Sequence, residues 1–241
     1  MCTRIVQAQG EDMLIHVREK PFELTGCDED VELVGHSVQF SNWLQRMDPR
    51  FQIQSITVQA IDRRFDGGLL FAKLYADVTD EDGRRVPGAV FLRGDAVGML
   101  IVLTAPSGKW VVLTVQPRFP SGQFESVEIP AGMMDDEGDF AGTAAREIKE
   151  ETGISIHRDE LRYLGEFFPS CGGTDEKILL YACEKKVSDE EIRDMQGRVT
   201  GAHHEHERIR LRIVPLDRLQ GSTNDPKALL ACGWLREMDD G

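Results

Sequence analysis

The chain has 241 residues, of which 41% are hydrophobic and 29% are charged, a composition typical of soluble globular proteins. Its net charge of −14, with no concentrated basic stretch to offset it, argues against nucleic acid as a partner. No apolar run approaches the roughly 18 residues of a membrane-spanning helix, and the N-terminal residues lack the pattern of a signal peptide, so we expect no membrane partner.

The N-terminal part of the chain is expected to form a sheet of short strands. Gln52–Ile61 alternates polar and apolar residues, and Leu69–Val78 and Val86–Leu92 follow as two further strand-like runs. Alternation over such short segments predicts an antiparallel sheet. Ser41–Met47 contains a tryptophan followed by a leucine and predicts a short helix. We therefore place an N-terminal antiparallel β-domain at residues 1–92.

A different pattern begins after residue 92, and we assign residues 93–241 to a second domain. The apolar runs Val97–Leu103 and Trp110–Val115 flank a Pro-Ser-Gly turn signal and predict a hairpin. Asp139–Thr152 is expected to be a helix with a capping aspartate at its start and a glycine after its end. Farther along, the pattern predicts strands at Ile178–Cys183 and Ile209–Val214, and helices that open at Ser188 and at Asp225–Pro226. This order of elements favours an α+β class with a mixed sheet over parallel βαβ repetition.

The predicted helix at 139–152 concentrates acidic side chains. At about 100° per residue, Glu147, Glu150 and Glu151 fall within an arc of roughly 100° on one side of the helix. Like charges at this spacing destabilise a helix, so an offsetting partner is expected, and a hard divalent cation such as Mg²⁺ is the natural candidate. From these residues alone, a solvated acidic face is the alternative.

The residues from Gly132 to Ile154 resemble the Nudix box. A glycine is followed, after thirteen residues, by Arg-Glu-Ile-Lys-Glu-Glu-Thr-Gly-Ile, which matches the family's spacing of Arg-Glu, Glu-Glu, glycine and aliphatic positions. One position departs from the pattern, because Gly138 stands where the family has a glutamate. This departure puts one ancillary metal contact in doubt and leaves the Arg-Glu and Glu-Glu core intact.

Segments on both sides of the box are similar to the ADP-ribose and ADP-sugar pyrophosphatase branch of the Nudix hydrolases. These segments are Pro87–Gly94, Val115–Arg118, Glu128–Gly132 and Phe167–Glu176. The plant-type ADP-sugar pyrophosphatase and the animal UDP-glucose pyrophosphatase are the most similar members. The resemblance implies the Nudix fold, in which a mixed β-sheet lies between helices as an α/β/α sandwich.

The resemblance also implies a reaction. The substrate would be a nucleoside diphosphate sugar of the ADP-glucose or UDP-glucose type, and the pyrophosphate bond would be hydrolysed to a nucleoside monophosphate and a sugar 1-phosphate. The cofactor would be Mg²⁺, with Mn²⁺ as an alternative. The implied metal ligands are the carbonyl of Ala131 and the carboxylates of Glu147 and Glu151, with Glu150 close by as a further catalytic candidate.

The family's general base comes from a loop, and here the matching loop precedes the predicted strand at Ile209–Val214. Either Glu205 or Glu207 would take the proton from water, and the other could bind metal. Glu205 is slightly favoured. A separate carboxylate is needed because metal occupies the helix carboxylates and lowers their basicity.

Several residues are implied to bind the substrate, and arginines among them would hold phosphate oxygens in a fixed fork. The substrate-binding candidates are Arg93, Gln116, Arg118, Glu128, Asp175 and Glu176. The family further implies a homodimer in which residues 1–92 contribute to the partner's substrate pocket. Arg93 is a candidate for reaching into that pocket.

Three alternatives stay open. Within the enzyme class, the chain could be an ADP-ribose pyrophosphatase. It could also be a catalytically silent ligand sensor with a Nudix fold, or a zinc-binding interaction protein built on His203, His204 and His206. The base and the sugar of the substrate are not fixed by the sequence. The five cysteines are an odd number without metal-ligand spacing, which indicates free thiols and a cytoplasmic location.

Overall fold

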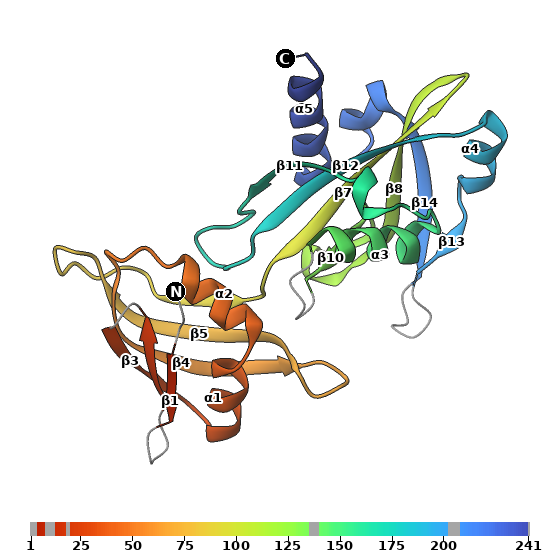
Figure 1. Cartoon of the computed structure of the whole chain (residues 1–241). Helices are drawn as coiled ribbons and strands as arrows, with labels where there is room; N and C mark the ends of the chain where they lie inside the picture. Colours follow the sequence, from red (N-terminus) through yellow and green to blue (C-terminus); the bar gives the residue numbers. More distant parts are fainter. Residues whose placement is uncertain (1–3, 8–12, 18–19, 135–139, 202–207, 241) are drawn as a thin grey trace. The chain divides into compact units, whose positions relative to one another are not determined.

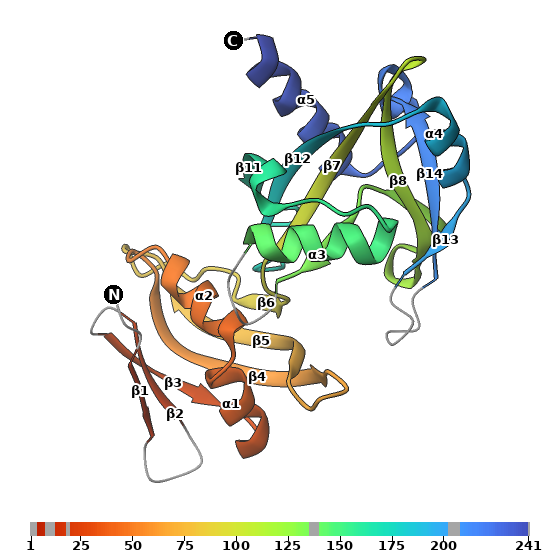
Figure 2. The same cartoon turned by 45° about the vertical axis from the view of Figure 1, so that its right-hand side comes forward.

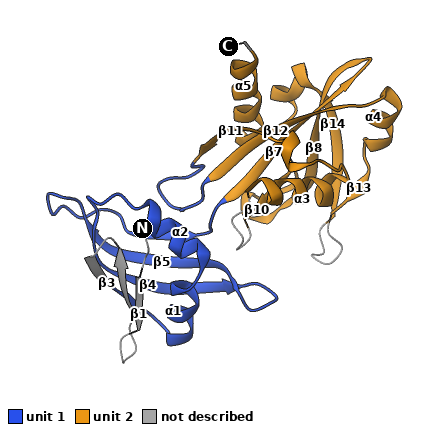
Figure 3. Ribbon diagram, viewed as in Figure 1, with its two compact units in different colours: residues 1–95, 168–177 blue, residues 96–167, 178–241 orange. Residues whose placement is uncertain are grey.

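The computed structural model describes residues 4–7, 13–17, 20–134, 140–201 and 208–240. The chain splits into two compact units, of which unit 1 comprises residues 1–95 and 168–177 and unit 2 comprises residues 96–167 and 178–241 (Figure 3). The segment 168–177 therefore belongs to unit 1, although its two ends continue into strands of unit 2. The combination of helices and mixed sheets confirms the predicted α+β class.

Unit 1 is built on a six-stranded sheet whose strands follow their order in the chain (Figure 1). The strands are β1 (Arg4–Gln7), β2 (Met13–Val17), β3 (Lys20–Thr25), β4 (Gln52–Arg63), β5 (Leu69–Thr79) and β6 (Ala89–Leu92). Neighbouring strands pair antiparallel except β3 and β4, which are parallel. Parallel neighbours need a long crossover connection, and the helices α1 (Asp28–Gly35) and α2 (Val38–Arg46) form it.

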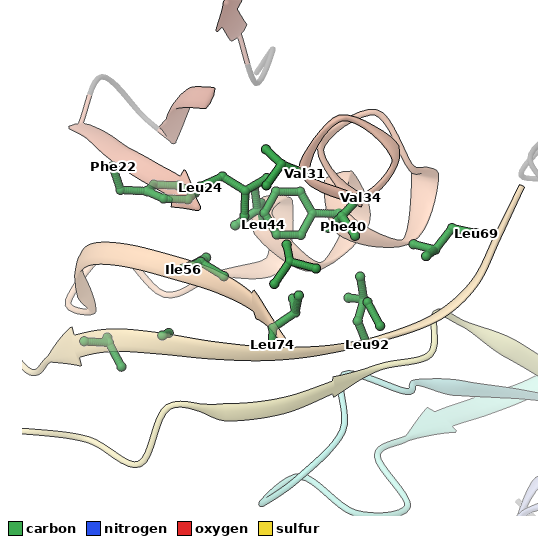
Figure 4. Packing of buried hydrophobic residues seen from close by; sticks show 14 residues of the cluster. Phe22, Leu24, Val31, Val34, Phe40, Leu44, Ile56, Leu69, Leu74 and Leu92 are labelled. Carbon is green, nitrogen blue, oxygen red and sulfur yellow. The ribbon is translucent and has the colours of Figure 1, made fainter. Parts of the chain in front are cut away.

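The core of unit 1 lies between these two helices and the sheet. Phe40 and Leu44 of α2 are buried and belong to the same hydrophobic cluster as Leu92 of β6 (Figure 4). Ser37 caps α2, because its hydroxyl oxygen accepts a hydrogen bond from the N–H of Phe40 at 3.2 Å. The helix predicted at Ser41–Met47 is confirmed, and it begins directly after this cap. The sequence pattern did not predict α1.

Unit 2 is a second sheet, of order β11-β12-β7-β8-β14-β13, with β10 paired to β7 and β9 paired to β8. Its strands are β7 (Ala96–Ala105), β8 (Gly108–Arg118), β9 (Gln123–Glu128), β10 (Ala131–Met133), β11 (Arg162–Phe167), β12 (Ile178–Lys186), β13 (Val199–Thr200) and β14 (Ile209–Pro215). Its helices are α3 (Phe140–Thr152), α4 (Asp189–Met195) and α5 (Pro226–Asp240), with 3₁₀ turns η1 (Phe119–Ser121), η2 (Arg158–Glu160) and η4 (Leu216–Gly221). Because β12 is parallel to β7 and the β7–β8 hairpin is antiparallel, the predicted mixed sheet is confirmed.

The two faces of the unit 2 sheet carry separate hydrophobic clusters. Neighbouring residues of β7 point to opposite faces, so that Leu100 joins the cluster under α5 and Ile101 joins the cluster under α3 and α4. Ala228 of α5 and Ile148 of α3 are fully buried in these clusters. Helices thus cover both faces of the sheet, and the expected α/β/α sandwich is confirmed (Figures 1 and 2). No described helix is long and apolar enough to cross a membrane.

Candidate active site

The carboxylates of α3 meet the strand β10 that precedes this helix in the chain. Glu151 is buried, with 4% of its surface exposed, and its Oε2 atom accepts a hydrogen bond from the N–H of Ala131 at 3.1 Å. The side chain of Glu147 lies over Gly132, where an added Cβ atom would sit 2.2 Å from Glu147 Cδ. A side chain at position 132 would push this carboxylate aside, so the glycine leaves room for it. Arg146, on the same helix, lies 3.6 Å from Glu147.

The position of Ala131 is fixed by the sheet. β10 pairs antiparallel with β7, where Ala131 is opposite Gly98. The N–H of Met99 donates to the carbonyl of Pro130 at 2.9 Å, which anchors the residue before Ala131 as well. The structure therefore places two predicted metal ligands, the carboxylates of Glu147 and Glu151, against the segment that holds the third, Ala131.

This set of oxygen donors fits a magnesium ion. Mg²⁺ is held by one or two carboxylates together with waters and substrate phosphates, and two carboxylates beside a backbone carbonyl supply that chemistry. Among the residues that the structure describes, no three His, Cys, Asp or Glu side chains converge as a metal site.

The remaining catalytic candidates lie at the C-terminal end of α3 or beyond it. Glu150 is exposed on the helix, and its backbone carbonyl accepts a hydrogen bond from the N–H of Gly201 at 3.3 Å. Glu205, Glu207 and the three histidines at 203, 204 and 206 lie outside the described residues. Their proposed roles as base or metal ligand stay predictions.

Two of the predicted substrate-binding residues are bound to each other. Arg118 of β8 makes a bidentate salt bridge to Glu128 of β9, with Nε–Oε1 and Nη2–Oε2 distances of 3.0 and 3.1 Å. Gln116, two residues before Arg118, is buried opposite Ser126 of β9. These two hydrogen bonds fix the orientation of the Arg118 guanidinium and occupy its Nε and Nη2 donors on the side that faces Glu128.

A second cation shares Glu128, and sequence reasoning missed it. Lys227 Nζ lies 3.6 Å from Glu128 and 3.0 Å from Asp225, in the first turn of α5. Burial by itself would raise the pKa of Glu128, but the Arg118 hydrogen bond and the charge of Lys227 outweigh it, and the pKa lies below its usual value. A lysine in the first turn of a helix is unfavourable for the helix dipole, and this was the signal that could have identified Lys227.

The other substrate-binding candidates form a cluster within unit 1. Arg93 Nε donates to Glu176 Oε1 at 2.8 Å, and its guanidinium lies 5.3 Å from the ring centre of Phe71. This arginine is 37% exposed and held from two sides, which limits its rotamers before any ligand binds. Asp175 is placed differently, because its side chain is fully buried.

Buried Asp175 is surrounded by donors. It accepts hydrogen bonds from the N–H groups of Arg93 and Gly94, at 2.6 and 3.2 Å, and Arg46 Nη2 lies 3.7 Å from its carboxylate. Arg46 Nη1 also lies 2.5 Å from Asp95. Sequence reasoning missed Arg46 and Asp95, because the contact joins residues 49 positions apart with no motif between them.

The chain matches a family model, a relative from a plant and a solved structure. A family model described as NUDIX domain matches residues 93–231. A protein from Arabidopsis thaliana named "Nudix hydrolase 14, chloroplastic" is 38% identical over 218 residues, which cover 83% of this chain and 70% of the relative. A solved structure titled "Crystal structure of ADP compounds hydrolase" matches with a TM-score of 0.55 at 16% identity, covering 80% of this chain and 96% of that chain. This last match is a likeness of fold.

Proposed function

Since the chain belongs to the Nudix hydrolase family, we propose that it hydrolyses the pyrophosphate bond of a nucleoside diphosphate sugar of the ADP-glucose or UDP-glucose type. The products are a nucleoside monophosphate and a sugar 1-phosphate. The observation that carries the proposal is the meeting of Ala131, Glu147 and Glu151 where β10 and α3 come together. It concentrates oxygen donors at one place and leaves a neighbouring face of α3 for the core.

Each proposed group has a defined task. Ala131, Glu147 and Glu151 would hold Mg²⁺. When bound, the ion would neutralise charge on phosphate oxygens and make water a stronger nucleophile. Glu205 or Glu207 takes the proton from this water, since the carboxylates of α3 are committed to the metal. Arg118, fixed by its bridge to Glu128, binds phosphate oxygens.

Two observations support the nucleotide-sugar substrate. The segments around the Nudix box resemble the ADP-sugar and UDP-glucose pyrophosphatases, and the structural neighbour is titled as a hydrolase of ADP compounds. ADP-ribose shares the ADP group and is the competing substrate. We also propose a homodimer in which residues 1–92 complete the partner's pocket. Cytoplasmic location stays a prediction, since the Arabidopsis relative is named as chloroplastic.

A substrate panel tests the proposed function. Purified protein is incubated with Mg²⁺ and ADP-glucose, UDP-glucose, ADP-ribose, GDP-mannose or a diadenosine polyphosphate, and released nucleoside monophosphate is quantified by chromatography. We expect the highest kcat/KM with ADP-glucose or UDP-glucose and loss of turnover in EDTA. Highest kcat/KM with ADP-ribose would assign the alternative enzyme, and no turnover of any compound would favour the silent sensor.

Light scattering of the same preparation tests the dimer. We expect the mass of two chains at the protein concentration of the assay. A monomer that is fully active at low nanomolar concentration would refute a pocket shared between two subunits.

A further inference from the structure

The last turn of α3 ends in backbone carbonyls that a helix cannot satisfy by itself. An α-helix leaves its final four carbonyl groups without intrahelical partners, and in α3 these belong to Lys149, Glu150, Glu151 and Thr152. The first of them accepts a hydrogen bond from the N–H of Gly153 at 2.9 Å. Gly153 adopts a left-handed conformation with a φ of 72°, which ends the helix in the usual way.

The segment Arg198–Gly201, which we call the clamp, supplies donors to the other three carbonyls. Arg198 Nη2 donates to Thr152 O at 2.5 Å, the Thr200 hydroxyl donates to Glu151 O, and the N–H of Gly201 donates to Glu150 O at 3.3 Å. The helix end and the clamp are more than 45 residues apart in the chain. Every carbonyl of the last turn therefore has a partner from outside the helix.

The clamp is held by its own hydrogen bonds. Thr200 lies opposite Ile209 in the β13–β14 ladder, and Ile209 is fully buried. The N–H of Leu211 donates to the carbonyl of Arg198 at 2.9 Å, which extends the pairing toward the start of the clamp. The donors thus belong to the edge of the unit 2 sheet, so they hold the end of α3 at a fixed place on this sheet.

The charge of Arg198 also suits this position. The C-terminal end of a helix carries partial negative charge, and acidic side chains in the last turn, such as Glu150 and Glu151, add to it. The guanidinium of Arg198 opposes this charge directly. An added Cβ atom at Gly153 would lie 3.2 Å from Arg198 Nη2, so the absence of a side chain there leaves room for the arginine.

We propose that Thr200 and Arg198 are positioning residues for the metal-binding carboxylate of Glu151, an inference that rests on the proposed function. Among the contacts of Glu151, the Thr200 hydroxyl donates to its backbone carbonyl and the Ala131 N–H donates to its carboxylate. Loss of the first contact lets the last turn shift relative to β10. The carboxylate of Glu151 and the carbonyl of Ala131 then no longer present a fixed spacing to a divalent cation.

The test compares Thr200→Val, which removes the hydroxyl and keeps the β-branched shape, with Thr200→Ser, which keeps the hydroxyl. Val199→Thr is the matched control, because Val199 lies on the same strand with an exposed side chain. The dissociation constant of Mn²⁺ is measured without substrate by electron paramagnetic resonance, and the melting temperature is measured in parallel. We expect Thr200→Val to weaken Mn²⁺ binding about tenfold, the lower range for partners that orient a metal ligand.

Thr200→Ser and Val199→Thr are expected to bind Mn²⁺ within about twofold of the wild type, since an unchanged hydroxyl or an exposed side chain leaves the ligand in place. A lower melting temperature of Thr200→Val with unchanged Mn²⁺ affinity would overturn the proposal and leave the clamp as a simple helix cap. Should Thr200→Val not fold, Arg198→Met is measured instead. Its Mn²⁺ binding is expected to weaken about threefold, because a charge-assisted hydrogen bond is lost.

Two outcomes separate the inference from the proposed function. A wild type that does not bind Mn²⁺ would refute both. Equal Mn²⁺ binding by wild type, Thr200→Val and Arg198→Met would refute the inference alone.

Discussion

Unit 1 and unit 2 each gather acidic side chains, but they surround them differently. In unit 1 the carboxylates of Asp95 and Asp175 have 5% and 0% of their surface exposed, and the guanidinium of Arg46 lies within 4 Å of both. In unit 2 three glutamates occur within five residues of one helix, and Glu150 among them is exposed. The first cluster is closed by one guanidinium and by N–H groups. On α3, buried Glu151 accepts a hydrogen bond from the Ala131 N–H and Glu147 lies 3.6 Å from Arg146, so only Glu150 is exposed.

The difference separates a structural use of charge from a functional one. A buried carboxylate matched by an arginine stabilises the fold only while its partner is present. Carboxylates that repel one another on a helix lower its stability, and a bound cation would offset this repulsion. Removing a charge should therefore destabilise unit 1 and leave α3 as stable as before or more stable.

The largest effect is expected from the α3 carboxylates. Glu151→Gln and Glu147→Gln each keep the shape of the side chain and remove the charge that a metal ion requires. We expect turnover with Mg²⁺ to fall about a thousandfold in each variant, because a group that stabilises transition-state charge is lost. The melting temperature, measured by differential scanning fluorimetry, should be unchanged or higher. A large fall in melting temperature would place these residues with the structural cluster.

A smaller effect, on stability, is expected from Arg46→Met. This change leaves Asp95 and Asp175 buried without their shared cation, and we expect the free energy of unfolding in urea to fall by about 3 kcal/mol. Arg50→Met is the matched control, since Arg50 pairs with Asp48 at the surface and is 68% exposed. Its loss should leave the free energy of unfolding nearly unchanged, because exposed ion pairs are screened by solvent. Equal effects of the two variants would contradict a structural role for the buried cluster.

The smallest expected effect is on the pH dependence of the free energy of unfolding, to which one carboxylate in each unit contributes with opposite sign. Burial raises the pKa of Asp175 above its ordinary 3.8, and its neighbouring N–H groups and Arg46 only partly oppose this. Glu128 behaves in the other direction, since burial is outweighed by Arg118 and Lys227 and its pKa lies below the ordinary 4.5. In the folded state, Asp175 therefore binds protons more readily than in the unfolded chain, and Glu128 binds them less readily.

The sign of each contribution follows from proton linkage. Glu128 contributes to the free energy of unfolding above its unfolded pKa of about 4.5, and this contribution is lost as the pH falls through its folded pKa. The contribution of Asp175 increases as the pH falls from above its raised folded pKa toward 3.8. We take the free energy of unfolding of the wild type minus that of each variant. From pH 7 to pH 4, this difference should fall for Glu128→Gln and rise for Asp175→Asn. Urea unfolding at several pH values measures both, and parallel slopes would contradict the assignment.

Local patterns in the sequence predicted much of unit 2. The apolar run that forms β7 and the turn signal after it were sufficient for the hairpin with β8. Ser188 forms a capping box with Glu191 at the start of α4, where the sequence placed a helix. The carboxylate spacing on α3 was also readable, because helical periodicity determines which side chains share a face.

Long-range contacts were not readable from the sequence. The segment 168–177 belongs to unit 1 because Asp175 meets the backbone of Arg93, which lies 82 positions earlier in the chain. The clamp at 198–201 has no motif, since its donors are one hydroxyl, one guanidinium and one backbone N–H. Lys227 reaches Glu128 across a similar distance in sequence. Periodicity and capping signals describe neighbours along the chain and carry no information about such pairings.

The measurement that tests the account most directly is Mn²⁺ binding to three proteins without substrate. These are the wild type, the double variant Glu147→Gln with Glu151→Gln, and Asp95→Asn as a control from the acidic cluster of unit 1. We predict that the wild type binds Mn²⁺, that Asp95→Asn binds it equally well if it is folded, and that the double variant loses binding while it stays folded. Binding by the double variant at wild-type affinity would show that the carboxylates of α3 do not hold the metal.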